Sequence, residues 1–247
     1  VWGKQAKRFF LTNHCNTTKV FDLGAPRLQA YFNFQKKINN KKKFLISYYD
    51  RATPDQNNNK KLFEYIETLL DTNKFTKKVT FIYKPHPYTY LKFIKIFNFK
   101  TYKNIKLAND YKRFYNYNNV SSKIKSSNFK NEINSLNQSD LIITSATSIA
   151  LEASILYKNV LVYIPNSKNS FFNERKANFY EHFKNIDKIE NIKFCSKLSE
   201  IGREITNFYT KKQKINKKSI DESRKFFLKK PKVDFSRSLY DCVKKLI

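Results

Sequence analysis

The sequence predicts an α/β fold, namely a Rossmann-like parallel sheet with helices on both faces, followed by helices at the C-terminal end. Strand-like and helix-like segments alternate between residues 43 and 210, and the strand-like segments at 140–144 and 159–165 are apolar almost throughout. Strands of that kind are typical of parallel sheets that helices cover on both sides. The length of 247 residues suffices for one substantial hydrophobic core.

Residues 1–42 combine short structured segments with a polar stretch. The expected elements are a helix at 3–11, a strand followed by a turn at 19–32, and a linker at 33–43. Gly24 and Pro26 are the residues that predict the turn. We expect 1–42 to be the end of a preceding domain together with a linker.

The segment 43–210 is expected to form the Rossmann-like domain. Its helices are predicted where apolar residues share one face, as Leu62, Ile66 and Leu69 do, and its strands where β-branched and aromatic residues follow one another. The expected order is a strand at 43–49, a helix at 59–71, a strand at 78–84, a helix at 88–97, a strand at 104–108, a helix at the end of 122–139, a strand at 140–144, a helix at 147–157 and a strand at 159–165. Two further helical patterns, at 219–228 and 235–247, predict a helical tail at 211–247.

The formal net charge of +29 raises the question of nucleic-acid binding. Only 8 of the 49 basic residues are arginine, the residue that base readout and bidentate phosphate contacts favour, so a nucleic-acid partner is not expected. The excess of Lys, Asn, Ile, Phe and Tyr along the whole chain is typical of an AT-rich genome. An electrostatic role stays open, either docking on an anionic membrane face or attracting phosphorylated substrates.

The cysteines Cys15, Cys195 and Cys242 are widely spaced and form no C-x-x-C pair. This pattern indicates reduced thiols in a cytoplasmic protein rather than a disulfide framework or a zinc site. No apolar run reaches transmembrane length, and no secretory signal is visible at the N-terminus. The chain lacks methionine and begins with Val1, which a fragment of a longer protein explains most simply.

Polar residues follow two of the predicted strands at the point where each strand ends. The segment Lys84-Pro85-His86-Pro87 ends one strand, and the loop Thr144–Ser148 follows another. In open α/β sheets, ligands bind outside the carboxyl ends of the strands. Both segments are therefore predicted to lie on one rim of the sheet.

The hydroxyl loop, residues 144–148, contains Thr144, Ser145, Thr147 and Ser148 and opens the helix predicted at 147–157. The N–H groups and partial positive charge of a helix N-terminus, together with hydroxyl donors, suit a phosphate. The alternative is that Thr147 or Ser148 only caps the helix, as such residues do routinely.

His86 is bracketed by two prolines, which remove backbone donors on both sides and restrict the chain. Its imidazole is thereby directed without a local backbone partner, and it can hydrogen-bond a phosphate when neutral or neutralise one when protonated. Lys84 adds a second cation. The alternative is a turn histidine with a structural role.

Glu152 lies four residues after Ser148, on the same helix face. A carboxylate at that position is suited to accept both ribose hydroxyls of a nucleotide, as acidic residues do in dinucleotide-binding folds. An exposed helix charge is the alternative, although the apolar neighbours Leu151, Ala153 and Ile155 favour a partly buried acid.

Several metal and phosphate motifs are absent from the sequence. None of the ten aspartates is followed by another two positions later, so there is no D-x-D metal clamp, and neither a P-loop nor a G-x-G-x-x-G motif occurs. We therefore expect no metal and no cofactor. The charge of a bound pyrophosphate falls to His86, Lys84 and the helix N-terminus.

With these motifs the sequence resembles the C-terminal half of a GT-B glycosyltransferase of the type that builds bacterial surface carbohydrates. Related patterns occur in capsule polysialyltransferases and CDP-glycerol glycerophosphotransferases. The segments that support the resemblance are 1–10, "LGAPRLQAY" at 23–31, "KPHP" at 84–87, 139–163 and the closing helices. It spans most of the chain, and its specificity lies in the order and spacing of the motifs.

The resemblance implies a nucleotide-binding domain. In such enzymes the histidine and the serine/threonine loop bind the phosphates of a CMP- or CDP-linked donor, which implies His86 and the hydroxyls of Thr144, Ser145, Thr147 and Ser148 here. Ala146 interrupts the run of serines that the family often has. Gly24 and Arg27 are implied to lie in the cleft between the two halves.

The implied activity is metal-independent transfer of a sugar or glycerol phosphate to a surface polysaccharide or lipid-linked acceptor. His86 is implied to stabilise the leaving phosphate. The base that activates the acceptor belongs, by resemblance, to an N-terminal half, so this piece is expected to bind donor without catalysing transfer. The implied location is the cytoplasm, and a peripheral contact with the inner face of the membrane stays open.

Two competing functions remain. A sugar-nucleotide epimerase has the same architecture and needs a pair of carboxylates that the sequence does not reveal. A non-enzymatic basic module that binds RNA or membrane is the other, and it predicts steep salt dependence with no requirement for His86 or Ser145.

Overall fold

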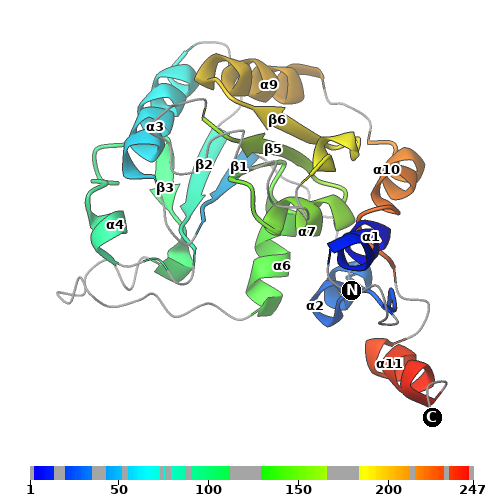
Figure 1. Cartoon of the computed structure of the whole chain (residues 1–247). Helices are drawn as coiled ribbons and strands as arrows, with labels where there is room; N and C mark the ends of the chain where they lie inside the picture. The colour runs from blue at the N-terminus through cyan, green and yellow to red at the C-terminus, as the bar shows by residue number, and fades with distance from the viewer. Residues whose placement is uncertain are drawn as a thin grey trace.

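Six parallel strands form one sheet at the centre of the molecule (Figure 1). The computed structural model describes residues 3–13, 20–34, 43–51, 55–72, 75, 79–86, 89, 91–111, 129–165, 184–211, 215–230 and 234–244. The strands are β1 (Phe44–Tyr49), β2 (Val79–Lys84), β3 (Ile105–Leu107), β4 (Leu141–Thr144), β5 (Asn159–Tyr163) and β6 (Ile192–Cys195). Their order is β3-β2-β1-β4-β5-β6, and each neighbouring pair is parallel. The predicted fold class is confirmed.

Helices cover both faces of the sheet. The helices α3 (Gln56–Leu70), α4 (Leu91–Lys95) and α9 (Leu198–Lys211) pack on one face, and α2 (Pro26–Phe32), α6 (Phe129–Gln138) and α7 (Ile149–Ile155) pack on the other. Consecutive strand residues point to opposite faces. Tyr48 accordingly packs against Phe63 of α3, whereas Tyr49 belongs to the buried cluster formed with α2 and α6.

The expected strands coincide with β1 to β5, and the expected helices with α1 (Lys4–Asn13), α3, α6, α7, α10 (Lys217–Arg224) and α11 (Phe235–Lys244). The helix expected at 88–97 is shorter, since α4 covers only Leu91–Lys95. The helix α7 also ends early, at Ile155, because Tyr157 has a φ of 54° and so leaves the helical conformation. The elements β6 and α9, and the short 3₁₀ helix η1 (Ile186–Lys188), were not predicted.

The strand expected within 19–32 is wrong. Residues 20–25 lie in neither a helix nor a strand, and α2 begins at Pro26. Proline suits the first position of a helix, because its fixed φ is already helical and its missing N–H needs no partner there. Gly24 has a φ of 85°, a conformation that glycine adopts without strain. The Gly–Pro signal therefore marks the start of a helix.

The domain boundaries expected at residues 42 and 210 stay predictions. The segments outside them contribute to the core, because Leu28 and Tyr31 of α2, and Phe227 and Leu228 after α10, share one buried cluster with α7. Both flanking segments therefore pack directly against the sheet domain, and α2 brings its own side chains to the edge of the sheet.

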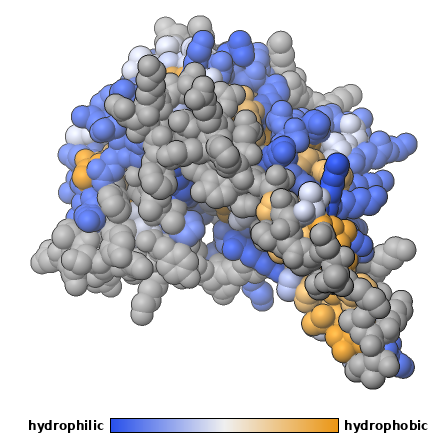
Figure 2. Space-filling view, in the orientation of Figure 1, coloured by the Kyte–Doolittle hydropathy of each residue, from blue (hydrophilic) through white to orange (hydrophobic). Residues whose placement is uncertain are grey.

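The helices α1 and α11 expose apolar side chains. Figure 1 shows α11 extending away from the sheet, and Figure 2 shows hydrophobic surface gathered in that part of the molecule. The exposed residues are Phe10 and Leu11 of α1 and Leu239, Tyr240 and Val243 of α11. None of the helices in the described ranges has the length and apolar composition that a membrane span requires. Cys195 and Cys242 are free thiols, and Cys15 lies outside the described residues.

Candidate functional site

The carboxyl ends of β2, β1 and β4 lie side by side. Tyr49 at the end of β1 pairs with Lys84 of β2 on one side and with Thr144 of β4 on the other. Neighbouring strands lie about 4.8 Å apart, so the backbones of Lys84 and Thr144 are separated by roughly 10 Å. The sheet order reverses between β1 and β4, the place where ligands of open α/β sheets bind. The two segments singled out in the sequence therefore share one rim.

The hydroxyl loop is shaped by its own side chains. Thr144 is buried. Its Oγ1 donates a hydrogen bond to the backbone oxygen of Tyr49 at 2.9 Å, and the same Oγ1 lies 2.9 Å from Oγ1 of Thr147. Ser148 does not cap α7 with its side chain; its Oγ donates to Glu152 at 3.1 Å. Because α7 has only seven residues, the loop defines this part of the rim more than the helix does.

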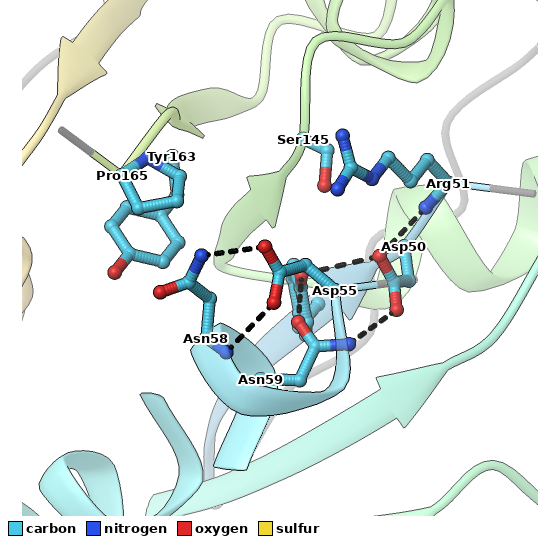
Figure 3. Close-up of a pocket in the computed structure, with 9 residues that line it drawn as sticks. Asp50, Arg51, Asp55, Asn58, Asn59, Ser145, Tyr163 and Pro165 are labelled. Carbon is cyan, nitrogen blue, oxygen red and sulfur yellow. Dashed lines mark hydrogen bonds between the residues drawn. The ribbon is translucent and has the colours of Figure 1, made fainter. Parts of the chain in front are cut away.

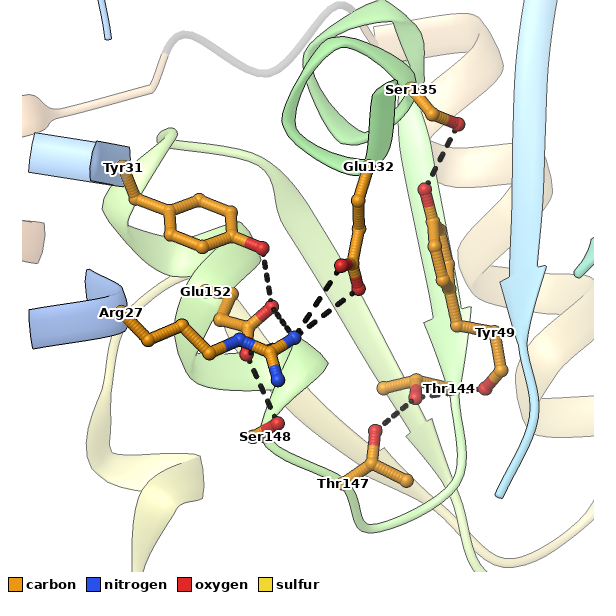
Figure 4. Close-up of polar contacts among 9 residues, drawn as sticks. All are labelled: Arg27, Tyr31, Tyr49, Glu132, Ser135, Thr144, Thr147, Ser148 and Glu152. Carbon is orange, nitrogen blue, oxygen red and sulfur yellow. Dashed lines mark hydrogen bonds and ion pairs between the residues drawn. The ribbon is translucent and has the colours of Figure 1, made fainter. Parts of the chain in front are cut away.

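Glu152 is the central acceptor on this side of the rim. Its side chain is 1% exposed and accepts hydrogen bonds from the hydroxyl of Tyr31 at 2.6 Å and from Ser148 at 3.1 Å. Nη2 of Arg27 lies 3.2 Å from its Oε1 (Figure 4). These contacts join α2 to α7 and to the hydroxyl loop. The acid is buried, not an exposed helix charge, and its contact with a ribose stays a prediction.

Arg27 also contacts a second carboxylate, Glu132, at 3.4 Å. Glu132 lies near the start of α6, which precedes β4 and therefore begins at the same rim. Its side chain is 26% exposed. Burial and the nearby charge of Glu152 raise the pKa of Glu132, while Arg27 and Lys84 oppose that shift. No sequence signal singled out Glu132, because only the fold brings its helix beside α2.

His86 and Arg27 influence each other electrostatically. His86 is half-buried, and burial together with the charge of Arg27 lowers the pKa of its imidazole, so the ring is neutral at pH 7. Burial also lowers the pKa of Lys84, against the charges of Asp110 and Glu132, and its Nζ lies 5.3 Å from the centre of the Tyr49 ring. Pro87 lies outside the described residues. Arg27 thus connects the histidine to the hydroxyl loop.

A second buried carboxylate, Asp50, lies directly after β1. It accepts hydrogen bonds from Asn59 Nδ2 at 2.6 Å, from the Arg51 backbone N–H at 2.8 Å and from the Tyr83 hydroxyl at 2.9 Å. Burial raises the pKa of Asp50, although these bonds oppose the shift. The Tyr48 hydroxyl lies 3.3 Å from Asp50, but it is closer to Asn59 Oδ1, at 2.8 Å.

The Asp50 cluster borders a small pocket that Ser145, Arg51 and Tyr163 also line (Figure 3). Its volume of about 20 Å³ suffices for one water-sized group. Ser145 therefore faces the end of β1, whereas Ser148 faces Glu152. Asp50 and Arg51 were missed in the sequence, although the rule that drew attention to the ends of β2 and β4 applies equally to β1.

The expectations for Gly24 and for metal binding stay predictions. Gly24 is buried just before α2, and Arg27 lies in the first turn of that helix; their place in an interdomain cleft stays a prediction. Within the described ranges, no three His, Cys, Asp or Glu side chains gather closely enough to hold a metal ion.

Comparison with solved structures identifies the fold. The chain is similar to S. aureus MnaA solved with UDP, at 15% identity over 99% of this chain and 58% of that one, with a TM-score of 0.59. It is similar to the Methanocaldococcus jannaschii UDP-GlcNAc 2-epimerase in complex with UDP-GlcNAc and UDP, at 16% identity over 98% and 59% of the chains, with a TM-score of 0.58. A variant of the wall teichoic acid polymerase TagF with CDPG matches at 15% identity over 98% and 55%, with a TM-score of 0.50.

At these identities the similarity shows the fold alone, which is that of the Rossmann-like half of GT-B enzymes, as the sequence resemblance implied. The chain spans between 55% and 59% of the length of these three solved structures. No protein-family model matches the chain, and no curated protein does.

Proposed function

We propose that this chain is the donor-binding half of a metal-independent transferase. The enzyme moves a sugar or glycerol phosphate from a CMP- or CDP-linked donor to a surface polysaccharide or lipid-linked acceptor, in the cytoplasm at the inner face of the membrane. The observation that supports this proposal is the shared rim. There, β1 lies between β2, which ends at the His86 segment, and β4, which ends at the hydroxyl loop. Similar structures solved with UDP and with CDPG support a nucleotide-activated donor.

His86 is proposed to stabilise the leaving phosphate. With a sugar donor, the bond between the sugar carbon and the phosphate oxygen breaks, the carbon bonds to the acceptor oxygen, and negative charge gathers on the departing nucleotide phosphate. With a glycerol phosphate donor, the phosphoanhydride P–O bond breaks instead, the phosphorus of the glycerol phosphate bonds to the acceptor oxygen, and CMP leaves with the negative charge. A neutral imidazole N–H donates to the departing phosphate, and its lowered pKa makes the neutral form the one present at pH 7. Loss of one such preorganised donor commonly costs about 3 kcal/mol in the transition state. The acceptor's proton goes to a base in the remainder of the longer protein.

The hydroxyl loop and Lys84 are proposed to hold the donor phosphates. Ser145, at the pocket below β1 and β4, and Ser148, beside Glu152, offer hydroxyls on the side toward His86, while Thr144 and Thr147 keep the loop in shape. Glu152 is proposed to accept the ribose hydroxyls. Since its side chain is 1% exposed, a ribose there takes the place of Ser148.

A sugar-nucleotide epimerase is the second candidate. Glu132 and Glu152 lie beside Arg27 as a pair of carboxylates that the sequence did not reveal, and Glu132 is 26% exposed. An epimerase needs such groups to move a proton. Similar solved structures include a UDP-GlcNAc 2-epimerase and a putative one from Listeria monocytogenes, with TM-scores of 0.58 and 0.56. Incubating the full-length protein with a nucleotide sugar and no acceptor separates the candidates, because only the epimerase yields an epimer.

The proposal is tested first by binding. In a thermal-shift panel of CMP, CDP, UDP and GDP, the preferred nucleotide raises Tm, because a ligand of the native state stabilises it by about 2.7 kcal/mol at one hundred times its Kd. We expect His86→Ala and Lys84→Ala to abolish that rise. Lys106→Ala on β3, which removes the same charge from an exposed position, is the matched control and keeps it.

Turnover by the full-length protein is the second readout. His86→Ala is expected to lower kcat by about 10²-fold, with an unchanged melting temperature of the free protein. An unchanged kcat rejects the role of His86. Steep salt-dependent binding of RNA or anionic vesicles that His86→Ala does not affect, together with no nucleotide response, favours the basic module instead.

A further inference from the structure

Arg27 is shared between two carboxylates of different character. All four of its contacts with them run to one nitrogen, Nη2, at 3.2 and 3.4 Å from Glu152 and at 3.4 and 3.5 Å from Glu132. A strong arginine–carboxylate pair instead uses two parallel N–H···O bonds of about 2.8 Å. Neither contact is of that kind. The guanidinium is therefore held between the two acids without being fully committed to either.

The two acids differ in how easily they give up Arg27. Glu152 is 1% exposed and is fixed by Tyr31 and Ser148, so it cannot move without disturbing α2 and the loop. Glu132 is 26% exposed, contacts Arg27 only at the limit of hydrogen-bonding distance, and lies on a different helix, α6. Of the two contacts, the one with Glu132 is the one that can open.

The charges around Arg27 are unsuited to a phosphate as they stand. Arg27 and Lys84 supply two positive charges, and Glu132 and Glu152 supply two negative ones, while His86 is neutral at pH 7. A nucleotide's phosphates bring two or three further negative charges. Repulsion between the phosphates and two adjacent carboxylates costs several kcal/mol. An anion at this rim therefore requires one carboxylate to move away or to take up a proton.

We infer that Arg27 is a phosphate ligand of this rim and that Glu132 is the group that releases it when the phosphate binds. Nη2 of Arg27 contacts Glu132 and Glu152, and Glu152 also accepts a hydrogen bond from Ser148, so the guanidinium lies beside the loop that is proposed to hold the phosphates. Glu152 keeps Arg27 attached to the rim during the exchange. Because Glu132 must be displaced, only ligands that bind Arg27 more strongly than this carboxylate does can occupy the site. This inference rests on the proposed function, since the anion is the donor's phosphate.

Protonation of Glu132 assists its release. The groups facing Glu132 are Arg27 and Tyr31 from α2, Tyr49 from β1, Lys84 from β2, Tyr111 after β3 and Glu152 from α7. Of the cations among them, Arg27 is the one that turns to the phosphate. The negative charge of Glu152 then acts on Glu132 with less opposition from the positive charge of Arg27, so Glu132 binds a proton more readily. Anion binding is accordingly coupled to proton uptake at this carboxyl.

The experiment measures the Kd of inorganic pyrophosphate and of CDP for this chain by calorimetry. Glu132→Gln removes the competing charge and is expected to tighten both ligands by roughly tenfold, and Arg27→Gln to weaken both by at least roughly tenfold. The matched controls are Glu64→Gln on α3 and Arg237→Gln on α11, which change the net charge equally at exposed positions remote from the rim. Both controls are expected to stay within about twofold of the wild type.

A second readout is the pH dependence of pyrophosphate affinity. The wild type is expected to bind more tightly as pH falls, because protonation of Glu132 removes a negative charge from the rim and protonation of His86 adds a positive one, and Glu132→Gln is expected to lose the Glu132 part of that slope. Buffers of different ionisation enthalpy report the proton uptake directly.

Each outcome decides between the readings. Weaker binding in Glu132→Gln means that Glu132 itself contacts the ligand, and an unchanged Kd in that variant means that Glu132 does not compete for Arg27. An unchanged Kd in Arg27→Gln means that Arg27 only ties α2 to α7. Each of these results overturns the inference. Pyrophosphate binding with the expected variant effects, but without any preference for nucleotides, upholds the inference and overturns the proposed function. No binding of either anion by the wild type overturns both.

Discussion

The rim contains two buried carboxylates, and they differ in what surrounds them. Asp50 after β1 accepts from three neutral donors on Asn59, Arg51 and Tyr83, and it is 4% exposed. Glu152 on α7 also has three donors, but one of them is the guanidinium of Arg27, whose side chain is 54% exposed.

This difference in donors indicates that the Asp50 cluster has a structural role and that the Glu152 cluster can take part in binding. The Asp50 cluster is closed, since Asn59 and Tyr83 are 3% and 0% exposed, so its bonds can only hold β1, β2 and α3 together. The Glu152 cluster opens to solvent through Arg27 and Glu132, so a ligand can exchange with one of its members. Two acids that are both buried thus differ in what their clusters can do, because their donors differ in charge and in access to solvent.

The largest expected effect concerns stability. Asp50→Ala leaves three buried donors without an acceptor, each worth about 1–3 kcal/mol, and is expected to lower the free energy of unfolding by about 4 kcal/mol. Glu152→Ala is expected to cost about 2 kcal/mol, because Arg27 and Ser148 can turn to water and only the Tyr31 hydroxyl stays buried. Urea unfolding measures both. Equal losses contradict the division into a closed and an open cluster.

A smaller effect is the pH dependence that Asp50 imposes. Its folded-state pKa is raised, so between its ordinary value of 3.8 and the raised value the folded protein binds a proton that the unfolded chain has lost. Stability from this group is therefore greatest at low pH and falls as pH rises through that window, by at most about 1.4 kcal/mol per pH unit.

Asp50→Asn removes that dependence. In urea unfolding between about pH 4 and 7, the stability advantage of the wild type over Asp50→Asn is expected to shrink as pH rises. Glu67→Gln on α3 serves as the control for a half-buried carboxylate that receives backbone N–H groups. An advantage that grows with pH rejects the view that burial dominates at Asp50.

The smallest expected effect concerns His86. The charge of Arg27 is one of the two causes that lower the pKa of His86, the other and larger one being burial. Arg27→Gln is therefore expected to raise that pKa, which NMR titration of the imidazole detects, with Arg237→Gln as the control. An unaltered pKa would mean that the charge of Arg27 does not act on His86, and that the Glu152 cluster does not interact with the residues after β2.

Much of the fold could be predicted because its signals are local. The apolar runs around Ile143 and Leu161 and the helical spacing of Leu62 and Ile66 are properties of neighbouring residues, and they predicted five of the strands. The strand β6 was not predicted because it is a short edge strand of four residues and Lys193 interrupts its apolar pattern. The turn expected near Pro26 proved to be a helix start, since Gly and Pro mark both.

The candidate site divides in the same way. Lys84, His86 and the hydroxyl loop could be found because strand ends are visible in the sequence and parallel strands end on one rim. Asp50 could have been found by that rule. Glu132 could not, because it reaches Arg27 from a helix 105 positions away, at an angle that only packing sets. Tyr31 lies on α2, the helix of Arg27, but its hydrogen bond to Glu152 of α7 also depends on how the two helices pack.

The sequence by itself determined which segments become strands and helices, and hence that two polar stretches end on a common edge, because these depend on periodicity and on residue type over a few positions. Only the tertiary structure decided which charges meet there. Arg27 lies between Glu132, Glu152 and His86 because α2 packs beside α7 and α6, and side chains from such distant segments are brought together by the burial of their apolar faces.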